Sequence, residues 1–311
     1  MLAKYLFKRT FQSIIILLGV ALLVFLFLRI IPGNPVVYML GEHADAATAR
    51  KITEKMGLDR PLPVQYFDYV KSIFTGNMGI SIIYGRPVSD MIAEAFPNTV
   101  KLALAAAVFA WVTGIGTAVY SVIRRHSIPA RIFNSFSVLG ISLPVFMIAM
   151  LLQYFLAFRL AIFPVSSPDI TLISLVLPAL TLGWSNAGEI YILSKSVLEE
   201  ALHSDYVIAA RAKGADIRHA VIHHALRNSF LPVMTLMSMQ LSSLLSGAVI
   251  TETIFSVNGL GRLAVDAISG RDMPVIQGTV LFATVIVIVF NLLADCLYAC
   301  VDKRTERRWK Y

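Results

Sequence analysis

The chain has 311 residues, of which 57% are hydrophobic and only 15% are charged, whereas a soluble domain averages roughly 45–50% apolar and about 25% charged residues. This composition excludes an ordinary soluble protein and indicates that lipid is the main solvent. The net charge of +8 comes from short basic clusters between apolar runs rather than from one basic face, so we expect no nucleic-acid partner.

Six apolar segments are long enough to cross a bilayer, which takes about 20 such residues. They cover residues 14–31, 100–123, 133–158, 172–193, 230–250 and 275–298. Pro144 and Pro178 fall inside the third and fourth segments, where we expect kinks that neighbouring helices can tolerate. Cys296 and Cys300 lie one helical turn apart in the last segment and are interpreted as small apolar residues. The sequence therefore predicts an all-α integral membrane protein with six transmembrane helices.

Lysine and arginine residues gather on one side of these predicted spans. Clusters occur at the N-terminus, in the connections after the second and fourth spans, and in the C-terminal tail, whereas the other short connections carry few. Because such clusters stay in the cytoplasm, we expect both termini to be cytoplasmic.

Two segments are too long to be simple turns. Residues 32–97 contain two helical stretches, 46–56 and 64–74, separated by Gly and Pro, which predicts a small folded cap on the extracytoplasmic side. Residues 194–229 face the cytoplasm. The predicted organisation is a cytoplasmic N-terminus with the first transmembrane helix (1–31), the cap (32–97), a five-helix core (98–298) and a basic cytoplasmic tail (299–311).

The cytoplasmic segment is predicted to form two short helices joined by a glycine turn. The first runs from Asp205 to Gly214, where glycine can adopt the left-handed conformation that ends a helix. Ser204 or Asp205 can cap its start. A second helix, 217–228, leads back to the membrane. On this pattern alone, a solvated hairpin and a docking surface for another protein both remain open.

The same segment resembles the cytoplasmic signature of ABC-importer permeases, and it is most similar to the dipeptide, oligopeptide and nickel branch. Ala209, Ala210 and Gly214 match the signature, and Ile208 stands where the general pattern has an acidic residue. The match continues in order through 57–66, 85–88, 224–228, 231–232, 252–256, 259–262 and 271–278. Residues 257–258 depart from it, because Val-Asn stands where the family usually has Trp-Pro.

The resemblance implies a type I ABC-importer permease fold and two sets of functional residues. Those expected to couple the chain to an ATPase are Asp205, Tyr206, Ala209, Ala210, Arg211, Ala212, Lys213, Gly214, Arg227 and Asn228. Those expected to contact a binding protein from an outer loop are Glu252, Gly259, Gly261, Arg262, Arg271 and Asp272.

The expected partners follow from the same resemblance. The sequence has no Gly-x-x-x-x-Gly-Lys-Ser/Thr phosphate loop, so we expect a non-catalytic chain that binds no cofactor itself. ATP and Mg would be bound by two partner ATPase subunits, a second homologous permease would complete the pathway, and an extracytoplasmic binding protein would deliver substrate. The expected location is the bacterial cytoplasmic (inner) membrane. Di- or oligopeptides are the expected substrates, with nickel or a metal–chelator complex as the alternative.

Two other classes of membrane protein compete with this interpretation. A membrane enzyme or metal site could use His219, His223 and His224, but no Glu completes a His-Glu-x-x-His motif, so a basic surface is favoured. An ATP-independent secondary transporter would show midplane ionisable residues or inverted repeats, and the predicted spans show neither. Glu189, Lys195 and Asp295 are assigned to cytoplasmic ends of their spans, where snorkelling or pairing is expected.

Overall fold

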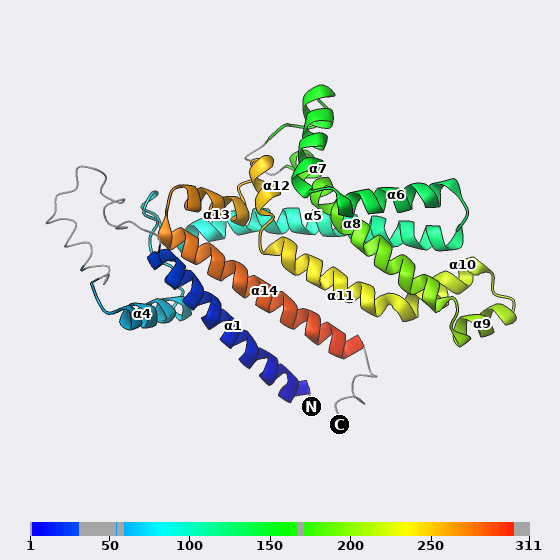
Figure 1. Cartoon of the computed structure of the whole chain (residues 1–311), viewed down its shortest axis with the longest axis horizontal. Coiled ribbons are helices and arrows are strands. Elements are labelled where there is room, and N and C mark those ends of the chain that lie inside the picture. Colours follow the sequence, from blue (N-terminus) through cyan, green and yellow to red (C-terminus); the bar gives the residue numbers. More distant parts are fainter. Residues whose placement is uncertain (1, 31–53, 55–58, 167–170, 302–311) are drawn as a thin grey trace.

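The computed structural model describes residues 2–30, 54, 59–166 and 171–301. Its helices are α1 (Leu2–Ile30), α4 (Leu62–Phe74), α5 (Val88–Ile123), α6 (Ile128–Ser142), α7 (Val145–Leu152), α8 (Leu172–Ala201), α9 (Asp205–Ala212), α10 (Ile217–His219), α11 (Leu226–Leu245), α12 (Val249–Ile254), α13 (Leu260–Ser269) and α14 (Met273–Val301), with π-helical turns at Gln153–Arg159 and Ala220–Ala225. Within the described residues the β-structure is limited to one bridge, between Ile80 and Pro87. The expected all-α architecture is therefore confirmed (Figure 1).

Three of the described helices are long and apolar enough to cross a membrane. They are α5 and parts of α1 and α14, at Arg9–Phe27 and Met273–Ala294. The pair formed by α6 and the segment Val145–Arg159 adds a fourth span if the two count as one. α8 and α11 are also long, but they carry more polar side chains. The number of six spans therefore stays a prediction.

The centre of the bundle is the pair formed by α5 and α8. Small residues bring the two backbones together. A Cβ on Gly114 would lie 2.8 Å from the Ala187 carbonyl oxygen, and a Cβ on Gly183 would lie 2.5 Å from Phe109 Cδ1. Close approach of this kind stabilises helix pairs in a membrane, where packing takes the place of the hydrophobic effect. α11 packs on α8 and α14, and α1 lies along α14.

The third predicted span is not one helix. α6 ends at Ser142, α7 begins at Val145, and the two parts are bent by 113°. Pro144 causes the break because its ring disfavours helical backbone at the preceding residue, and Leu143 is extended, with φ −84° and ψ 133°. The expectation of a tolerated kink at Pro144 is therefore wrong, whereas α8 continues through Pro178.

The predicted return helix and fifth span form one helical stretch. α10, a π-helical turn and α11 follow one another from Ile217 to Leu245 without a break. Gly247, with φ +117°, then turns the chain into α12. The predicted end of the fifth span at residue 250 is therefore wrong, because the glycine ends the helix at Leu245.

The predicted cap is described in part. Its second predicted helix, 64–74, is confirmed as α4, which begins at Leu62. The first, 46–56, lies outside the described residues apart from Glu54. The bridge between Ile80 and Pro87 closes a hairpin, and α5 begins directly after it, well before the predicted start of the second span at residue 100.

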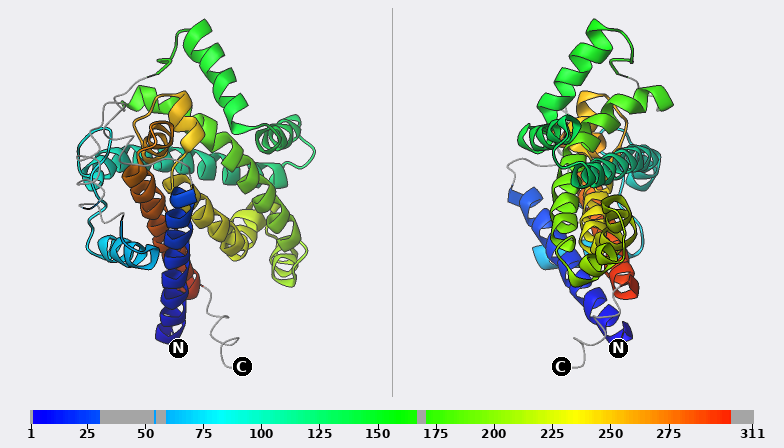
Figure 2. Two further views of the ribbon diagram at one scale, coloured as in Figure 1. Left: turned by 60° about the vertical axis from the view of Figure 1, so that its left-hand side comes forward. Right: turned by 90° about the vertical axis from the view of Figure 1, so that its right-hand side faces the viewer.

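The helices define two ends of the molecule. The start of α1, the end of α14 and α9 lie toward one end, which we call the α9 end (Figure 1). α12 and α13 lie together toward the other, which we call the α13 end, and two turned views agree (Figure 2). The start of α1 therefore shares an end with the segment that the charge pattern assigns to the cytoplasm.

Candidate functional site

α9 is a short helix that exposes most of its surface at the α9 end. Val207 is its one buried side chain and has no exposed surface. The cluster around Val207 contains Val122 of α5, Leu198 and Ala201 of α8, and Ala220, Val221 and Ala225 of the π-helical turn. Burial of one valine contributes roughly 1.5–3 kcal/mol. α9 is therefore anchored at a single point and displays its remaining side chains.

A glycine ends α9, as the sequence predicts. Gly214 has φ +94°, a conformation that glycine adopts without steric cost. Its N–H donates to the Arg211 carbonyl at 3.0 Å, and the Ala215 N–H donates to the Ala210 carbonyl at 3.2 Å. These two bonds form a Schellman motif, which fixes the turn that leads from α9 into the return helix.

The start of α9 differs from the prediction. Ser204 precedes the helix, but its hydroxyl donates to the Ala201 carbonyl and accepts no bond from the helix backbone. Asp205 is the first helical residue and places its carboxylate in the first turn, where the helix dipole favours negative charge. The predicted side-chain cap is therefore absent, and the dipole interaction takes its place.

The residues predicted to couple to an ATPase lie in two groups. Exposed on α9 and its final turn are Asp205, Tyr206, Ala209, Arg211, Ala212, Lys213 and Gly214, with Ala210 half-buried. Arg227 and Asn228 are exposed at the start of α11, and neither has a hydrogen bond or ion pair within the described part of the chain. Next to them, the Ser229 hydroxyl donates to the Val197 carbonyl at 3.3 Å and so joins α11 to α8. The sequence did not indicate this contact.

The three histidines of the return helix lie close together. The rings of His219 and His223 stack with centroids 4.2 Å apart, and the His219 and His224 rings are 5.7 Å apart. In the described residues, no group of three or more His, Cys, Asp or Glu side chains is placed to hold a metal ion.

At the α13 end, Glu252 of α12 forms a buried carboxylate site. It has no exposed surface. One oxygen accepts a hydrogen bond from the Thr99 hydroxyl at 2.8 Å, and the other accepts one from the Arg262 backbone N–H at 3.0 Å. The Gly261 N–H also donates to the Glu252 carboxylate. These N–H groups belong to the first turn of α13, so the carboxylate supplies the cap that Gly259, which precedes the helix, lacks.

Two glycines make room for this carboxylate. A Cβ on Gly259 would lie 2.5 Å from Glu252 Cδ, and a Cβ on Gly261 would lie 2.8 Å from Val249 Cα. Burial raises the pKa of the Glu252 carboxyl above its usual range, although the bonds from Arg262, Thr99 and Gly261 act in the opposite direction. The Gly-x-Gly-Arg motif is thus explained by the space and the N–H groups that one buried carboxylate needs.

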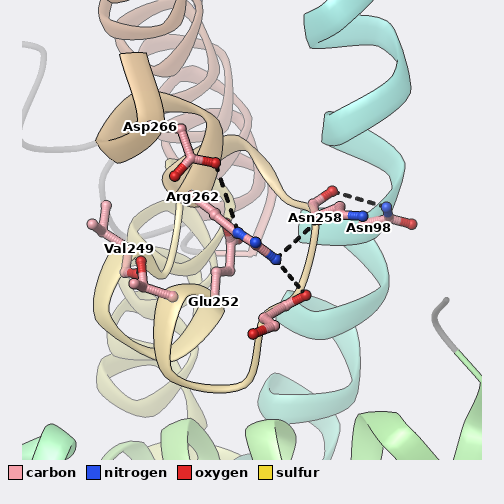
Figure 3. Close-up of polar contacts among 8 residues, drawn as sticks. Asn98, Val249, Glu252, Asn258, Arg262 and Asp266 are labelled. Carbon is pink, nitrogen blue, oxygen red and sulfur yellow. Dashed lines mark hydrogen bonds and ion pairs between the residues drawn. The ribbon is translucent and has the colours of Figure 1, made fainter. Parts of the chain in front are cut away.

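The Arg262 side chain closes the same loop (Figure 3). Its Nη1 donates to the Ser256 carbonyl at 2.7 Å and to Asn258 Oδ1 at 3.1 Å, and its Nε lies 3.7 Å from the Asp266 carboxylate. Asn98 of α5 donates to the Asn258 carbonyl at 2.9 Å. Arg262 therefore holds the loop together from within, and Asn98 attaches it to α5.

Asp272 is a second carboxylate anchor, and it joins segments far apart in the chain. It accepts hydrogen bonds from the Ser81 hydroxyl at 2.5 Å, the Ile82 N–H at 3.1 Å and the Ile83 N–H at 3.2 Å. The hairpin before α5 is therefore fixed to the start of α14. The sequence motifs contained both segments but did not indicate that they pair.

The structure separates the six residues predicted for the outer loop into buried and accessible ones. The buried ones are Glu252, Gly259, Gly261 and Asp272. Arg262 is half-buried, and Arg271 is exposed in a left-handed conformation with φ +55°. The buried residues act inside the fold. Contact between this loop and a binding protein stays a prediction.

Two family models match the chain. Residues 106–307 match the family described as "Binding-protein-dependent transport system inner membrane component", and residues 1–103 match the model of its N-terminal part. The chain belongs to this permease family. The resemblance to ABC-importer permeases is therefore confirmed, and the permease is a non-catalytic membrane subunit of an ABC importer.

Curated relatives extend over nearly the whole permease. The glutathione transport system permease protein GsiC of Pectobacterium atrosepticum is 37% identical over 299 residues, which make up 96% of this chain and 97% of the relative. GsiC of Salmonella typhimurium is 37% identical and GsiC of Escherichia coli K12 is 36% identical, with the same coverage.

Solved transporters share the fold of the permease core. An inward-facing structure of the MetNI methionine ABC transporter matches with a TM-score of 0.57 and 15% identity, covering 68% of this chain and 97% of that chain. An amino acid ABC transporter with histidines matches with a TM-score of 0.51 and 15% identity, covering 68% of this chain and 94% of that one. The expected type I importer permease fold is therefore confirmed.

Proposed function

We propose that this permease forms, with a second homologous permease, the pathway of an ATP-driven importer of small peptides, glutathione among them. Two ATPase subunits bind ATP and Mg, and an extracytoplasmic binding protein delivers the substrate. The permease lies in the bacterial cytoplasmic (inner) membrane with both termini and α9 in the cytoplasm. Family membership supports this assembly. Glutathione, which the relatives' names specify, is a tripeptide, and peptides are also the substrates that the sequence motifs favour.

The exposed helix α9 is the observation that carries the proposal. It is anchored by Val207, ended by Gly214, and placed at the same end of the molecule as the start of α1. A short helix held in this way suits insertion into a groove on an ATPase subunit. The small side chains of Ala209 and Ala212 allow close approach, and Arg211 supplies charge for the contact.

The cluster around Val207 supplies a mechanical connection from α9 to the membrane helices. Val207 packs against residues of α5, α8 and the π-helical turn that leads into α11. Since packed interiors transmit displacement rather than absorb it, a push on α9 moves these elements together. ATPase closure would then tilt α8 and α11 and switch the pathway between inward- and outward-facing states.

Uptake by the purified assembly tests this function. The permease is co-purified with its partners in mild detergent and reconstituted in proteoliposomes, and uptake of labelled glutathione, trialanine and Ni²⁺ is measured. The proposal expects peptide uptake that requires both ATP and the binding protein. Uptake of Ni²⁺ but of neither peptide would contradict peptide import and support the metal alternative. Peptide uptake that persists without ATP would contradict the ATP-driven mechanism.

A further inference from the structure

Glu189 is an ionisable residue in the part of α8 that packs against α5. It lies in α8 between Ala187 and Ile190, and these two neighbours pack against Gly114 of α5. Gly114 lies nine residues before Ile123, where α5 ends, which is about 13 Å along the helix axis at a rise of about 1.5 Å per residue. The assignment of Glu189 to the end of its span stays a prediction, and its observed partner is the neutral side chain of Gln240.

Gln240 of α11 holds the Glu189 carboxylate in place. The amide of Gln240, a residue only 5% exposed, donates to Glu189 Oε2 at 3.0 Å and to the Asn186 carbonyl at 3.1 Å. Because the Glu189 carboxylate and the Asn186 carbonyl are both acceptors, the Gln240 amide must turn its NH₂ group toward them. Gln240 Oε1 is buried without a hydrogen-bond partner in the described structure, which is a costly state for an acceptor. The pair therefore has an excess of acceptors at a fixed position.

The exposed carboxylate of Glu189 is unsuited to a surface that faces lipid. Glu189 is exposed in the single subunit and forms no ion pair with a basic side chain of the described residues. The exposed residues of α8 and α11 include the polar Thr235 and Ser243 and the apolar Ile192 and Met239. Because a charge facing lipid is strongly disfavoured, a position of Glu189 against the pathway is favoured over one against lipid.

We propose that Glu189, positioned by Gln240, binds the ammonium group of a peptide during its passage. The proposal rests on peptide import as the function. An ammonium carries three N–H donors and no acceptor, which complements a site that offers a carboxylate and lacks donors. Glu189 Oε2 is already held by Gln240, so Oε1 is free to receive the ligand in a charge-assisted hydrogen bond.

Binding of two matched peptides to the assembled transporter tests the site. The complex is placed in nanodiscs without its binding protein, and the Kd values of trialanine and N-acetyl-trialanine are measured by saturation-transfer NMR. Loss of one charge-assisted bond corresponds to about a tenfold or greater change in Kd. E189Q should weaken trialanine binding by that factor and leave N-acetyl-trialanine binding unchanged. E200Q is the matched control, because Glu200 is an exposed glutamate on the same helix, and it should behave as wild type.

Several results would overturn the site. They are equal trialanine affinity of wild type and E189Q, an equal loss in E200Q, or equal affinity of wild type for the two peptides. If E189Q instead releases the second permease during purification, the carboxylate pairs with a subunit and binds no substrate. Trialanine uptake by the complete wild-type system separates this inference from the function on which it rests. Absence of that uptake contradicts peptide import, whereas normal uptake with unchanged binding in E189Q contradicts the ammonium site alone.

Discussion

Replacing Gly259 by alanine tests whether Glu252 is a structural anchor. The added methyl group would lie 2.5 Å from Glu252 Cδ, whereas carbon atoms make contact at about 3.5–4.0 Å, so the carboxylate must move by about 1 Å. That shift lengthens the 2.8 Å bond from Thr99 and the 3.0 Å bond from Arg262 beyond hydrogen-bonding range. Each hydrogen bond to a charged group contributes about 1.5–3 kcal/mol, so we expect a loss of about 3–6 kcal/mol in the free energy of unfolding.

Thermal unfolding of the purified complex in nanodiscs measures this loss. At roughly 2–4 °C per kcal/mol, Gly259→Ala should unfold about 6–24 °C below wild type. Gly116→Ala on α5 is the matched control, because a Cβ at this position would meet nothing within 4 Å. Its Tm should equal that of wild type or lie slightly above it. A wild-type Tm for Gly259→Ala would refute the anchor. If that variant were stable but no longer stimulated by the binding protein, the loop would be a contact surface instead.

Two further predictions concern α9 and pH. Gly214 has φ +94°, so Gly214→Ala should lower the stability of the α9 turn by about 1–2 kcal/mol and raise hydrogen exchange in α9 about 5- to 30-fold. The control Gly19→Ala should leave exchange in α1 unchanged. Equal protection of α9 in the two variants would contradict the strained turn. Because burial raises the pKa of Glu252, the folded state binds this proton more tightly than the unfolded state. Its contribution to stability is therefore greatest at low pH and falls as pH rises from the ordinary glutamate value of about 4.3 through the folded value. The Tm of wild type relative to Glu252→Gln should decline over that window, and a constant difference would contradict the burial argument.

Local signals predicted much of the secondary structure. Gly214 ends α9 and residues 64–74 are helical, because helix boundaries depend mainly on residues within a few positions. Pro144 shows the limit of such signals. A proline inside an apolar run is compatible with a kinked helix and with a full break, and the packing of the flanking segments decides between them. The same limit applies to the end of the fifth span, which depends on the conformation of Gly247.

Long-range pairing was the part that the sequence could not supply. Asp272 was identified as part of an outer motif, yet its three hydrogen-bond donors lie in the hairpin that precedes α5. Glu252 likewise bonds to Thr99 of α5. Motif matching located these carboxylates without showing that they face inward. Glu189 was interpreted by its position in the chain, and its hydrogen bond with Gln240 of α11 became evident only from the structure.

Site-specific photo-crosslinking tests the coupling role of α9 most directly. Tyr206 on α9 and Tyr84 before α5 are both exposed, at 42% and 58%, and each can be replaced singly by benzoylphenylalanine in the complete transporter. We predict that the probe at position 206 forms an adduct with an ATPase subunit, identified by mass spectrometry, and that the probe at position 84 does not. An ATPase adduct at position 84 with none at position 206 would contradict the assignment of α9 as the coupling helix and reverse the proposed orientation.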